Sequence, residues 1–228
     1  MQSIYIPTPI YYATDKPHVG HAYTTVAADV LTRYWKRKLG DEQVFFSVGT
    51  DEHGQKTAAA ARKAGLEPRA FVDSLIPRFT QAWERLGIAP SIFLRTTNPT
   101  HEAFAREYFA KLHAQGDIYK AAYTGLYCVG CEAYKTQTEL VDGKCPDHPN
   151  LTPEHQNEDN YFFRLTKYRA QVVEAIESGR LKIEPALRRN EVLARLAGDV
   201  RDISISRPRV SWGIPLPWDE THTIYVWV

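Results

Sequence analysis

The sequence has few cysteines, no long apolar run and almost no net charge, and each absence excludes a class of protein. Three cysteines occur in 228 residues, and an odd, closely spaced set argues against a disulfide framework and for a cytosolic metal site. No stretch of about 18 apolar residues is present, so we expect no transmembrane helix. Residues 1–5 lack the charged head and apolar run of a secretory leader. These absences predict a cytoplasmic protein with no membrane partner.

The formal net charge of +1 provides no global basic field for nucleic acid. Any RNA contact must therefore be local, or must lie outside this chain. The composition, 43% hydrophobic and 24% charged, is that of an ordinary globular protein. The length suits one large domain or two small ones. Composition alone therefore leaves the function open.

Two common nucleotide-binding signatures are also missing. The sequence contains neither G-x-G-x-x-G nor G-x-x-x-x-G-K-[ST], so dinucleotide binding and P-loop chemistry lose their main sequence support.

The first half of the chain alternates strand and helix patterns. Residues 3–6 form a short β-rich run that Pro7 and Pro9 should stop, residues 20–39 have helical periodicity, and residues 44–48 are almost continuously apolar. Such a run is typical of a strand buried on both faces of a parallel sheet. Further segments are expected as helices at 55–64, 69–86 (with Pro77 inside) and 102–115, and as a strand at 92–94. The alternation predicts an α/β fold with a Rossmann-like, doubly wound parallel sheet.

The second half has a different texture. We expect a polar loop at 150–158, helices at 167–178 and 191–196, and strands at 203–205 and 223–228. This divides the chain into the first half of a catalytic domain (1–116), an inserted connective subdomain (117–200) and a return toward the catalytic domain (201–228). A strand-like run at the very end also leads us to expect a truncated piece of a longer protein.

The cysteines form a metal-binding pattern together with one histidine. Cys128, Cys131, Cys145 and His148 are spaced C-x2-C-x13-C-x2-H. Thiolates and imidazole are the ligands that zinc prefers, and four protein ligands make a closed, structural site. We therefore predict one structural zinc per chain, in a zinc knuckle within the connective subdomain. Asp147 and His155 are weaker candidates as substitute ligands.

A second candidate site lies between the first strand and the first helix. His18 and His21 flank Gly20 and share one helix face. Glycine lets a ligand lie against the backbone, and a helix N-terminus favours phosphate. Two imidazoles there can donate hydrogen bonds to a phosphate that gains charge in a transition state.

At this turn the chain resembles the class I aminoacyl-tRNA synthetases, whose signature is His-Ile-Gly-His; Val19 replaces the isoleucine. Within that class it is most similar to the enzymes specific for methionine. The position of the knuckle agrees with those enzymes. The other matching motifs are PTPIYY at 7–12, GTDEHG at 49–54, SR at 206–207, WGIP at 212–215 and YVW at 225–227.

The resemblance implies an ATP-dependent methionine-tRNA ligase, which forms methionyl-adenylate and transfers methionine to tRNA. Its substrates would be methionine, ATP with Mg and tRNA. The implied catalytic residues are His18 and His21, which with Gly20 would bind ATP. The implied methionine-binding residues are Ile10, Tyr12, Asp51 and Trp227, and Arg207 would support the adenylate.

Physical chemistry agrees with the methionine assignment. Asp51 follows the apolar run at 44–48 and so lies at the carboxyl end of a strand, where open α/β sheets bind ligands. Its carboxylate can neutralise an ammonium group, and aromatic rings suit a polarizable thioether. Core packing of Tyr12 and Trp227, and helix capping by Asp51, are the alternative interpretations.

The family's Lys-Met-Ser-Lys-Ser loop and its helical anticodon-binding domain have no counterpart in the sequence. We expect both to lie beyond Val228, so the chain by itself should be inactive or weakly active. The oligomeric state is not predicted.

Two other functions fit parts of the pattern. One is a metallohydrolase in which His18, His21, Asp51 and His53 hold a catalytic metal. The other is a non-enzymatic zinc-knuckle module that binds RNA. Its stacking and basic residues would be Tyr119, Tyr123, Tyr127, Tyr134 and Lys135.

Overall fold

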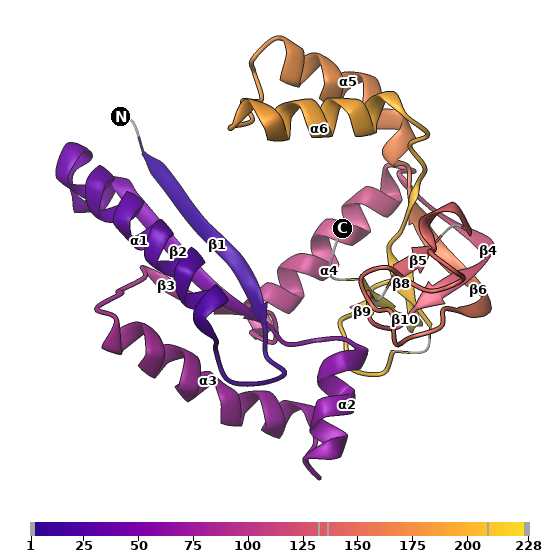
Figure 1. Ribbon diagram of the computed structural model, residues 1–228, viewed down its shortest axis with the longest axis horizontal. Helices are drawn as coiled ribbons and strands as arrows, with labels where there is room; N and C mark the ends of the chain where they lie inside the picture. The colour runs from indigo at the N-terminus through magenta and orange to yellow at the C-terminus, as the bar shows by residue number, and fades with distance from the viewer. Residues whose placement is uncertain (1–2, 132, 136, 209, 226–228) are drawn as a thin grey trace. The chain divides into compact units, whose positions relative to one another are not determined.

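The computed structural model describes residues 3–131, 133–135, 137–208 and 210–225 (Figure 1). The chain forms two compact units. The first comprises Met1–Arg106 and Val210–Ile214, and the second comprises Glu107–Arg209 and Pro215–Val228. The short segment Val210–Ile214 therefore packs with the first unit, although its neighbours on both sides in sequence belong to the second.

The first unit is built on a parallel sheet of three described strands in the order β1-β2-β3. Strand β1 (Ile4–Tyr12) pairs with β2 (Val44–Asp51), and β2 pairs with β3 (Ile92–Arg95). The connecting helices are α1 (Val19–Leu39), α2 (Gln55–Lys63) and α3 (Pro68–Arg85), with a 3-10 turn, η1, at Asp41–Gln43. The alternation confirms the predicted α/β fold with a parallel sheet.

Strand β1 is longer than the sequence predicted. It continues through Pro7 and Pro9, and its register against β2 shifts between Pro7 and Ile10. The prediction that the prolines end the strand was wrong. Among the described strands β1 lies at the sheet edge, where a missing N–H and an irregular register are tolerated.

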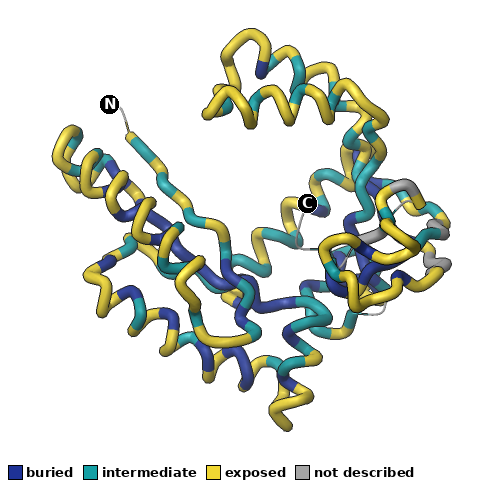
Figure 2. Tube along the Cα trace, viewed as in Figure 1, coloured by how far each residue is buried: buried dark blue, intermediate teal, exposed yellow. Residues whose placement is uncertain are grey.

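The core of the first unit lies between β2, α1 and α3. Phe46 and Val48 of β2 pack in one cluster with Ala28 of α1 and with Phe79 and Trp83 of α3. All five are nearly or fully buried, and Figure 2 shows β2 as a buried strand. Apolar burial of this kind stabilises the sheet that carries the candidate site.

Gly49 of β2 allows a close approach between strands. A Cβ atom at this position would lie 2.4 Å from the backbone oxygen of Leu94 on β3 and 3.3 Å from Cγ2 of Ile10 on β1. Any larger residue would force the parallel strands apart beside Ile10, which the family resemblance implies as a methionine-binding residue.

The second unit contains an antiparallel sheet in the order β5-β4-β6-β7. Strand β4 (Ile118–Cys128) pairs with β6 (Glu154–Phe163) from Ile118 opposite Phe163 to Tyr127 opposite Glu154. The polar loop expected at 150–158 was therefore wrong from Glu154 onward. Pairing with the aromatic-rich β4 overrides the low strand propensity of the polar residues.

Short strands and helices complete the second unit. The short strands are β5 (Ala133–Lys135), β7 (Ile203–Ser204), β8 (Ser206–Arg207), β9 (Pro215–Leu216) and β10 (Asp219–Ile224), with a 3-10 turn, η2, at Gln137–Glu139. The strand predicted at 223–228 begins earlier, and its described part ends at Ile224. Helix α4 (Pro99–Ala114) runs from the first unit into the second. Helices α5 (Leu165–Glu177) and α6 (Ala186–Ala197) run side by side (Figure 1).

The predicted helices are confirmed, with small shifts at their ends. The largest difference is in α6, which starts at Ala186, five positions before the predicted start at 191. None of the described helices is both long and apolar enough to span a membrane.

Candidate functional site

The two signature histidines cap the first helix through their side chains. Nδ1 of His18 accepts a hydrogen bond from the backbone N–H of Gly20 at 3.1 Å, and Nδ1 of His21 accepts one from the N–H of His18 at 3.3 Å. The two rings stack with their centroids 3.7 Å apart. This reciprocal capping fixes the entrance to α1 and holds both imidazoles in one place.

The capping hydrogen bonds also determine where the histidine protons lie. Because Nδ1 accepts in both rings, neutral His18 and His21 carry their proton on Nε2. Burial, followed by the nearby charge of His18, lowers the pKa of His21 below its ordinary value. His21 is therefore neutral near pH 7, and each ring presents one Nε2–H donor for an oxyanion.

Gly20 leaves room for this arrangement. A Cβ atom there would lie 3.0 Å from Cε1 and 3.1 Å from Nδ1 of His18. An alanine would press on the His18 ring and disturb its stacking on His21. The glycine thus serves the geometry of the histidine pair directly.

A hollow of about 370 Å³ adjoins the histidine pair. It brings together four predicted site residues: Ile10, Tyr12, His18 and His21. The remaining lining residues are Tyr11, Thr14, Asp15 and Lys16. No role was predicted for these four residues, although their position at or just after the end of β1 was a signal that they face the same space.

Asp51 ends β2 directly beside β1. It pairs with Tyr12 in the sheet register, its backbone oxygen accepts from the N–H of Ala13 at 3.0 Å, and the residue is fully buried. Tyr12 is half-buried, with the Lys56 ammonium 5.1 Å from its ring centroid. The structure thus places Asp51 and Tyr12 side by side at the carboxyl edge of the sheet, although Asp51 does not line the hollow.

The next residue, Glu52, anchors this edge. Its fully buried carboxylate accepts hydrogen bonds from Arg95 Nε and Nη2 at 2.8 Å, and from the hydroxyls of Thr50 and Thr97 at 2.6 Å. A buried carboxylate requires such complete pairing. Through Arg95 the network also reaches Asp73 of α3. It therefore ties β2, β3 and α3 together beside Asp51.

Trp212 supports this edge of the sheet, a role that the sequence did not predict. Its Nε1–H donates to the backbone oxygen of Glu52, and its own oxygen accepts from the N–H of Gly54. Its ring centroid lies 5.2 Å from that of His53. The motif match at 212–215 was the available signal, but contacts so distant in sequence have no local signature.

His53 is buried and neutral. Its Nε2 lies 3.7 Å from Oε1 of Glu102, and only 6% of the side chain is exposed. Burial, the largest influence, lowers the pKa of His53 to about 4 despite the opposing charge of Glu52. The residue packs beneath the sheet edge as a structural group.

Arg207 belongs to the second unit and is engaged there. Its Nη1 donates to Oγ of Ser204 at 3.0 Å and to the backbone oxygen of Ser206 at 2.8 Å. Its guanidinium lies 4.0 Å from the ring centroid of Tyr225. Trp227, the last predicted methionine-binding residue, lies outside the described residues.

The four predicted zinc ligands come together in the second unit. Cys128 ends β4, Cys131 lies in the turn before β5, and Cys145 and His148 form an isolated β-bridge. Their ligand atoms all lie within 4.8 Å of one another, with Cys131 Sγ 3.4 Å from Cys145 Sγ and 3.3 Å from His148 Nδ1. A tetrahedral zinc ion with sulfur at about 2.3 Å requires sulfur atoms about 3.8 Å apart. The donor set and its spacing fit zinc.

Gly130 makes the knuckle possible. A Cβ atom at this position would lie 2.4 Å from Cγ of His148, so the ligand ring packs directly on the glycine backbone. The weaker ligand candidates are outside the group of four, although Oδ2 of Asp147 lies 3.8 Å from Cys131 Sγ. Asp147 is exposed and pairs with Lys135 at 3.6 Å, and the exposed His155 lies on β6.

The structure does not favour the metallohydrolase. Within the described ranges of the chain, the four knuckle residues are the only group of three or more His, Cys, Asp or Glu side chains arranged to hold a metal. Its proposed ligands, His18, His21, Asp51 and His53, form no such group.

The described residues also do not support the interpretation of the knuckle as an RNA-binding module. Tyr127 is buried, and Tyr119 donates to Asp202 at 2.9 Å and stacks on Phe162. Lys135 is paired with Asp147. The side chains of Tyr123 and Tyr134 lie outside the described residues. The described tyrosines are therefore packing groups and offer no free face to a base.

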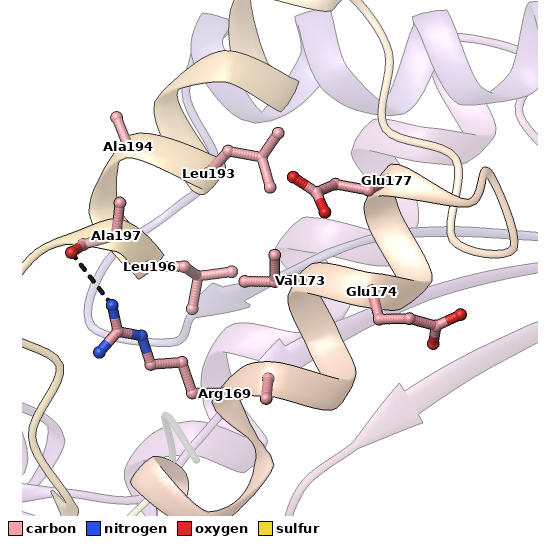
Figure 3. A pocket seen from close by; sticks show the side chains of 9 residues that line it. Arg169, Val173, Glu174, Glu177, Leu193, Ala194, Leu196 and Ala197 are labelled. Atoms are coloured by element: carbon pink, nitrogen blue, oxygen red, sulfur yellow. Dashed lines mark hydrogen bonds between the residues drawn. The ribbon is translucent and has the colours of Figure 1, made fainter.

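A second hollow, of about 750 Å³, lies between α5 and α6 (Figure 3). Its lining is mainly aliphatic, including Val173, Leu193 and Leu196, with Arg169 donating to the oxygen of Ala197 at 3.0 Å. It contains no predicted site residue and no histidine or cysteine. The hollow is the packing interface of a helical hairpin and contributes nothing to the candidate site.

Comparison with known families identifies the chain. The family described as tRNA synthetases class I (M) matches residues 4–151 and 149–228. The chain belongs to the class I (M) tRNA synthetases. The resemblance seen in the motifs is confirmed, and the Rossmann-like fold agrees with it.

Individual relatives support the same family. The chain is 44% identical to the methionine–tRNA ligase of Streptomyces coelicolor, a match covering 100% of this chain and 43% of that protein. It is 43% identical to the methionine–tRNA ligase of Caldanaerobacter subterraneus, covering 100% of this chain and 35% of that protein. The chain thus spans well under half the length of these relatives.

A solved structure of the family superposes closely. Mycobacterium tuberculosis methionyl-tRNA synthetase in complex with methionyl-adenylate has a TM-score of 0.92 and 36% sequence identity. The match covers 100% of this chain and 45% of that protein. The backbone of this chain therefore closely follows that of the matching part of the M. tuberculosis enzyme, which was solved with methionyl-adenylate.

Proposed function

We propose that this chain carries ATP- and methionine-binding residues of a methionine-tRNA ligase, which activates methionine as methionyl-adenylate and transfers it to tRNA. The observation that carries the proposal is the stacked pair His18 and His21. Both rings line the hollow at the N-terminus of α1 with an Nε2–H donor each. The M. tuberculosis relative, solved with methionyl-adenylate, supports the same chemistry.

Adenylate formation makes particular demands on such a site. A carboxylate oxygen of methionine forms a bond to the α-phosphorus of ATP, the bond from that phosphorus to the bridging oxygen breaks, and pyrophosphate leaves, bound to Mg. Negative charge builds on the phosphate oxygens during this step. We propose that His18 and His21 donate Nε2–H hydrogen bonds to these oxygens, strengthening as the charge develops. Gly20 would let the nucleotide approach the backbone.

For methionine, we propose that Asp51 neutralises the ammonium group. A buried carboxylate beside Tyr12, at the carboxyl edge of a parallel sheet, suits a small cationic group. Ile10, Tyr12 and Trp227 would contact the side chain, whose polarizable sulfur suits aromatic neighbours. Arg207 would support the adenylate site.

We also propose that the Cys128–Cys131–Cys145–His148 cluster binds one structural zinc ion. The four ligands are supplied entirely by the protein, so the site is closed and would stabilise the turns around it. A thiol-based metal site fits a reducing compartment, so we propose a cytoplasmic location. The knuckle would belong to a connective subdomain at 117–200, between catalytic segments at 1–116 and 201–228.

Calorimetric titration tests the proposed function. Methionine should bind the purified chain, and a non-hydrolysable ATP analogue should change its affinity, because the two ligands would meet at one site. Leucine, of similar size but without sulfur, should bind more weakly. Equal affinities for leucine and methionine, or no heat from either ligand, would count against the assignment.

A further inference from the structure

A third hollow adjoins the candidate nucleotide site. Its volume is about 460 Å³. The lining residues are Lys16, Pro17, Arg78, Gln81, Ala82, Arg85 and Leu86. Lys16 also lines the hollow that contains His18 and His21. The two hollows therefore meet at one lysine in the turn between β1 and α1.

One face of α3 forms the floor of this hollow. Residues 78, 81, 82 and 85 follow the spacing i, i+3, i+4 and i+7, which places their side chains in one row. Arg78 and Arg85 stand at the two ends of that row, about 10 Å apart along the helix axis. Gln81 and Ala82 lie between them.

The cations of this hollow are not used to hold the fold together. Lys16, Arg78 and Arg85 are exposed, and no ion pair involves any of them among the residues that the structure describes. Other arginines of the same unit are paired: Arg33 with Asp29, Arg69 with Asp73, and Arg95 with Glu52.

Acidic groups near the hollow are few. Asp15 also faces the turn, where its Oδ1 accepts a hydrogen bond from the backbone N–H of Lys16 at 2.7 Å. Glu84 is exposed on α3, but it does not line the hollow. The local charge of the hollow is therefore positive in a chain with a formal net charge of only +1.

We infer that Lys16, Arg78 and Arg85 form a binding surface for the sugar-phosphate backbone of a single-stranded RNA that leads toward the candidate nucleotide site. The inference rests on the proposed function, which requires an RNA end to reach the adenylate. With a near-neutral chain, such contact must be local, and this surface supplies a local cluster of unpaired cations.

The geometry favours a strand of phosphates over a single bound nucleotide. Flexible cations separated along a helix can each meet a different phosphate of a chain, whereas one triphosphate would occupy the histidine hollow on the other side of Lys16. None of the lining residues is aromatic, so no base is stacked. Pro17, Ala82 and Leu86 offer apolar area to ribose, and recognition would be independent of sequence.

Fluorescence anisotropy with a short, labelled single-stranded RNA tests the inference on the whole chain. The test variant is Arg78→Gln/Arg85→Gln. The matched control is Arg62→Gln/Lys63→Gln, which removes two exposed cations from the end of α2 in the same unit. Removing two phosphate contacts should weaken RNA binding roughly tenfold and lower the slope of log K against log salt by about 1.4. The control should bind as the unaltered chain does.

The outcomes separate this surface from the nucleotide site. The affinity for an ATP analogue, measured on the same variants, should stay within twofold of the unaltered chain. An equal loss of RNA affinity in both double variants would show non-specific attraction and overturn the inference. Unchanged RNA affinity in Arg78→Gln/Arg85→Gln would also overturn it. Loss of ATP-analogue binding in Arg78→Gln/Arg85→Gln would assign the hollow to the nucleotide and likewise overturn it. If methionine and ATP fail to bind but the RNA result holds, the proposed function fails and the RNA surface stands.

Discussion

His18 and His21 do two things at once: they cap α1, and they fix their own protonation pattern. Each Nδ1 is committed to a backbone N–H, which leaves each Nε2–H as a donor. The sequence predicted the pair and its place at a helix start. The ring stacking and the choice of tautomer could not be predicted, because they depend on hydrogen-bond geometry that spacing alone does not specify.

Asp51 offers a direct residue-scale test of methionine recognition. Asp51→Asn keeps the shape of the buried side chain but removes the charge that would neutralise the ammonium group. Losing one charge-assisted partner should weaken methionine binding by about 2 kcal/mol, or roughly thirtyfold. Calorimetric titration measures this change. Asp41→Asn, an exposed change in η1, serves as the control and should leave the affinity unchanged. Equal affinities in both variants would remove Asp51 from the site.

His53 predicts how stability depends on pH. Its pKa in the folded chain is about 4, below the ordinary value of 6.5, so the unfolded state binds more protons between these values. Stability should therefore fall as the pH drops from about 6.5 to about 4, by roughly 3 kcal/mol when the full window is crossed. Urea unfolding at a series of pH values measures this loss.

The matched variant is His53→Asn, which cannot titrate in this window. Its loss of stability on acidification should be smaller than that of the unaltered chain by approximately the same 3 kcal/mol. Parallel stability curves for the two proteins would show that His53 does not control the acid sensitivity.

At the scale of elements, the sequence predicted best where periodicity was strong. Helix α3 and strand β2 lie close to their expected positions because their apolar residues are buried. Helix α1 also lies where it was expected, although its regularly spaced Val26, Val30 and Tyr34 are exposed. The prediction of secondary structure failed at β1, where the edge position tolerates Pro7 and Pro9. It also failed at β6, where pairing with β4 gives strand structure to a polar segment. Both failures arise from tertiary context that a local pattern does not contain.

The knuckle supplies the element-scale prediction. Gly130→Ala should reduce zinc affinity strongly, because the added methyl group would lie 2.4 Å from the His148 ring and displace that ligand. Cys131→Ser should release the metal outright by removing one thiolate. Zinc content after dialysis, measured by plasma mass spectrometry, distinguishes these variants from the unaltered chain.

Val129→Ala is the control for the knuckle. Val129 is exposed in the same turn, so its truncation should leave one zinc per chain. Hydrogen exchange of β4 and β5 should speed up in Cys131→Ser and stay slow in Val129→Ala. A Cys131→Ser protein that kept its zinc and its slow exchange would show that the cluster is not the metal site.

At the scale of the whole molecule, the packing of Val210–Ile214 with the first unit could not be predicted from the sequence. Trp212 donates to the backbone of Glu52, a partner 160 positions away. Such a contact leaves no periodic or spacing signal. The family motifs at 49–54 and 212–215 marked both segments as important, but only the fold shows that they meet.

The candidate site was predicted more completely than the contacts that support it. Ile10, Tyr12, His18 and His21 share one hollow, and the four predicted zinc ligands form one cluster, as the motifs indicated. The Glu52–Arg95 network was not predicted, since its residues come from two strands and a helix. Residue spacing predicts groups whose members are close in sequence. A network whose members are brought together by the sheet can be recognised only when the fold is known.

The most direct test of the central claim is calorimetric binding of methioninyl adenylate, in which a methylene group replaces the reactive carbonyl and the phosphate is kept. The unaltered chain should bind this compound. His21→Ala should bind it roughly 10 to 100 times more weakly, the scale for losing one hydrogen bond to a charged group. His155→Ala, which removes an exposed histidine from β6, should bind like the unaltered chain. Equal binding by all three proteins, or no binding by any of them, would contradict the assignment of the His18–His21 turn to the adenylate.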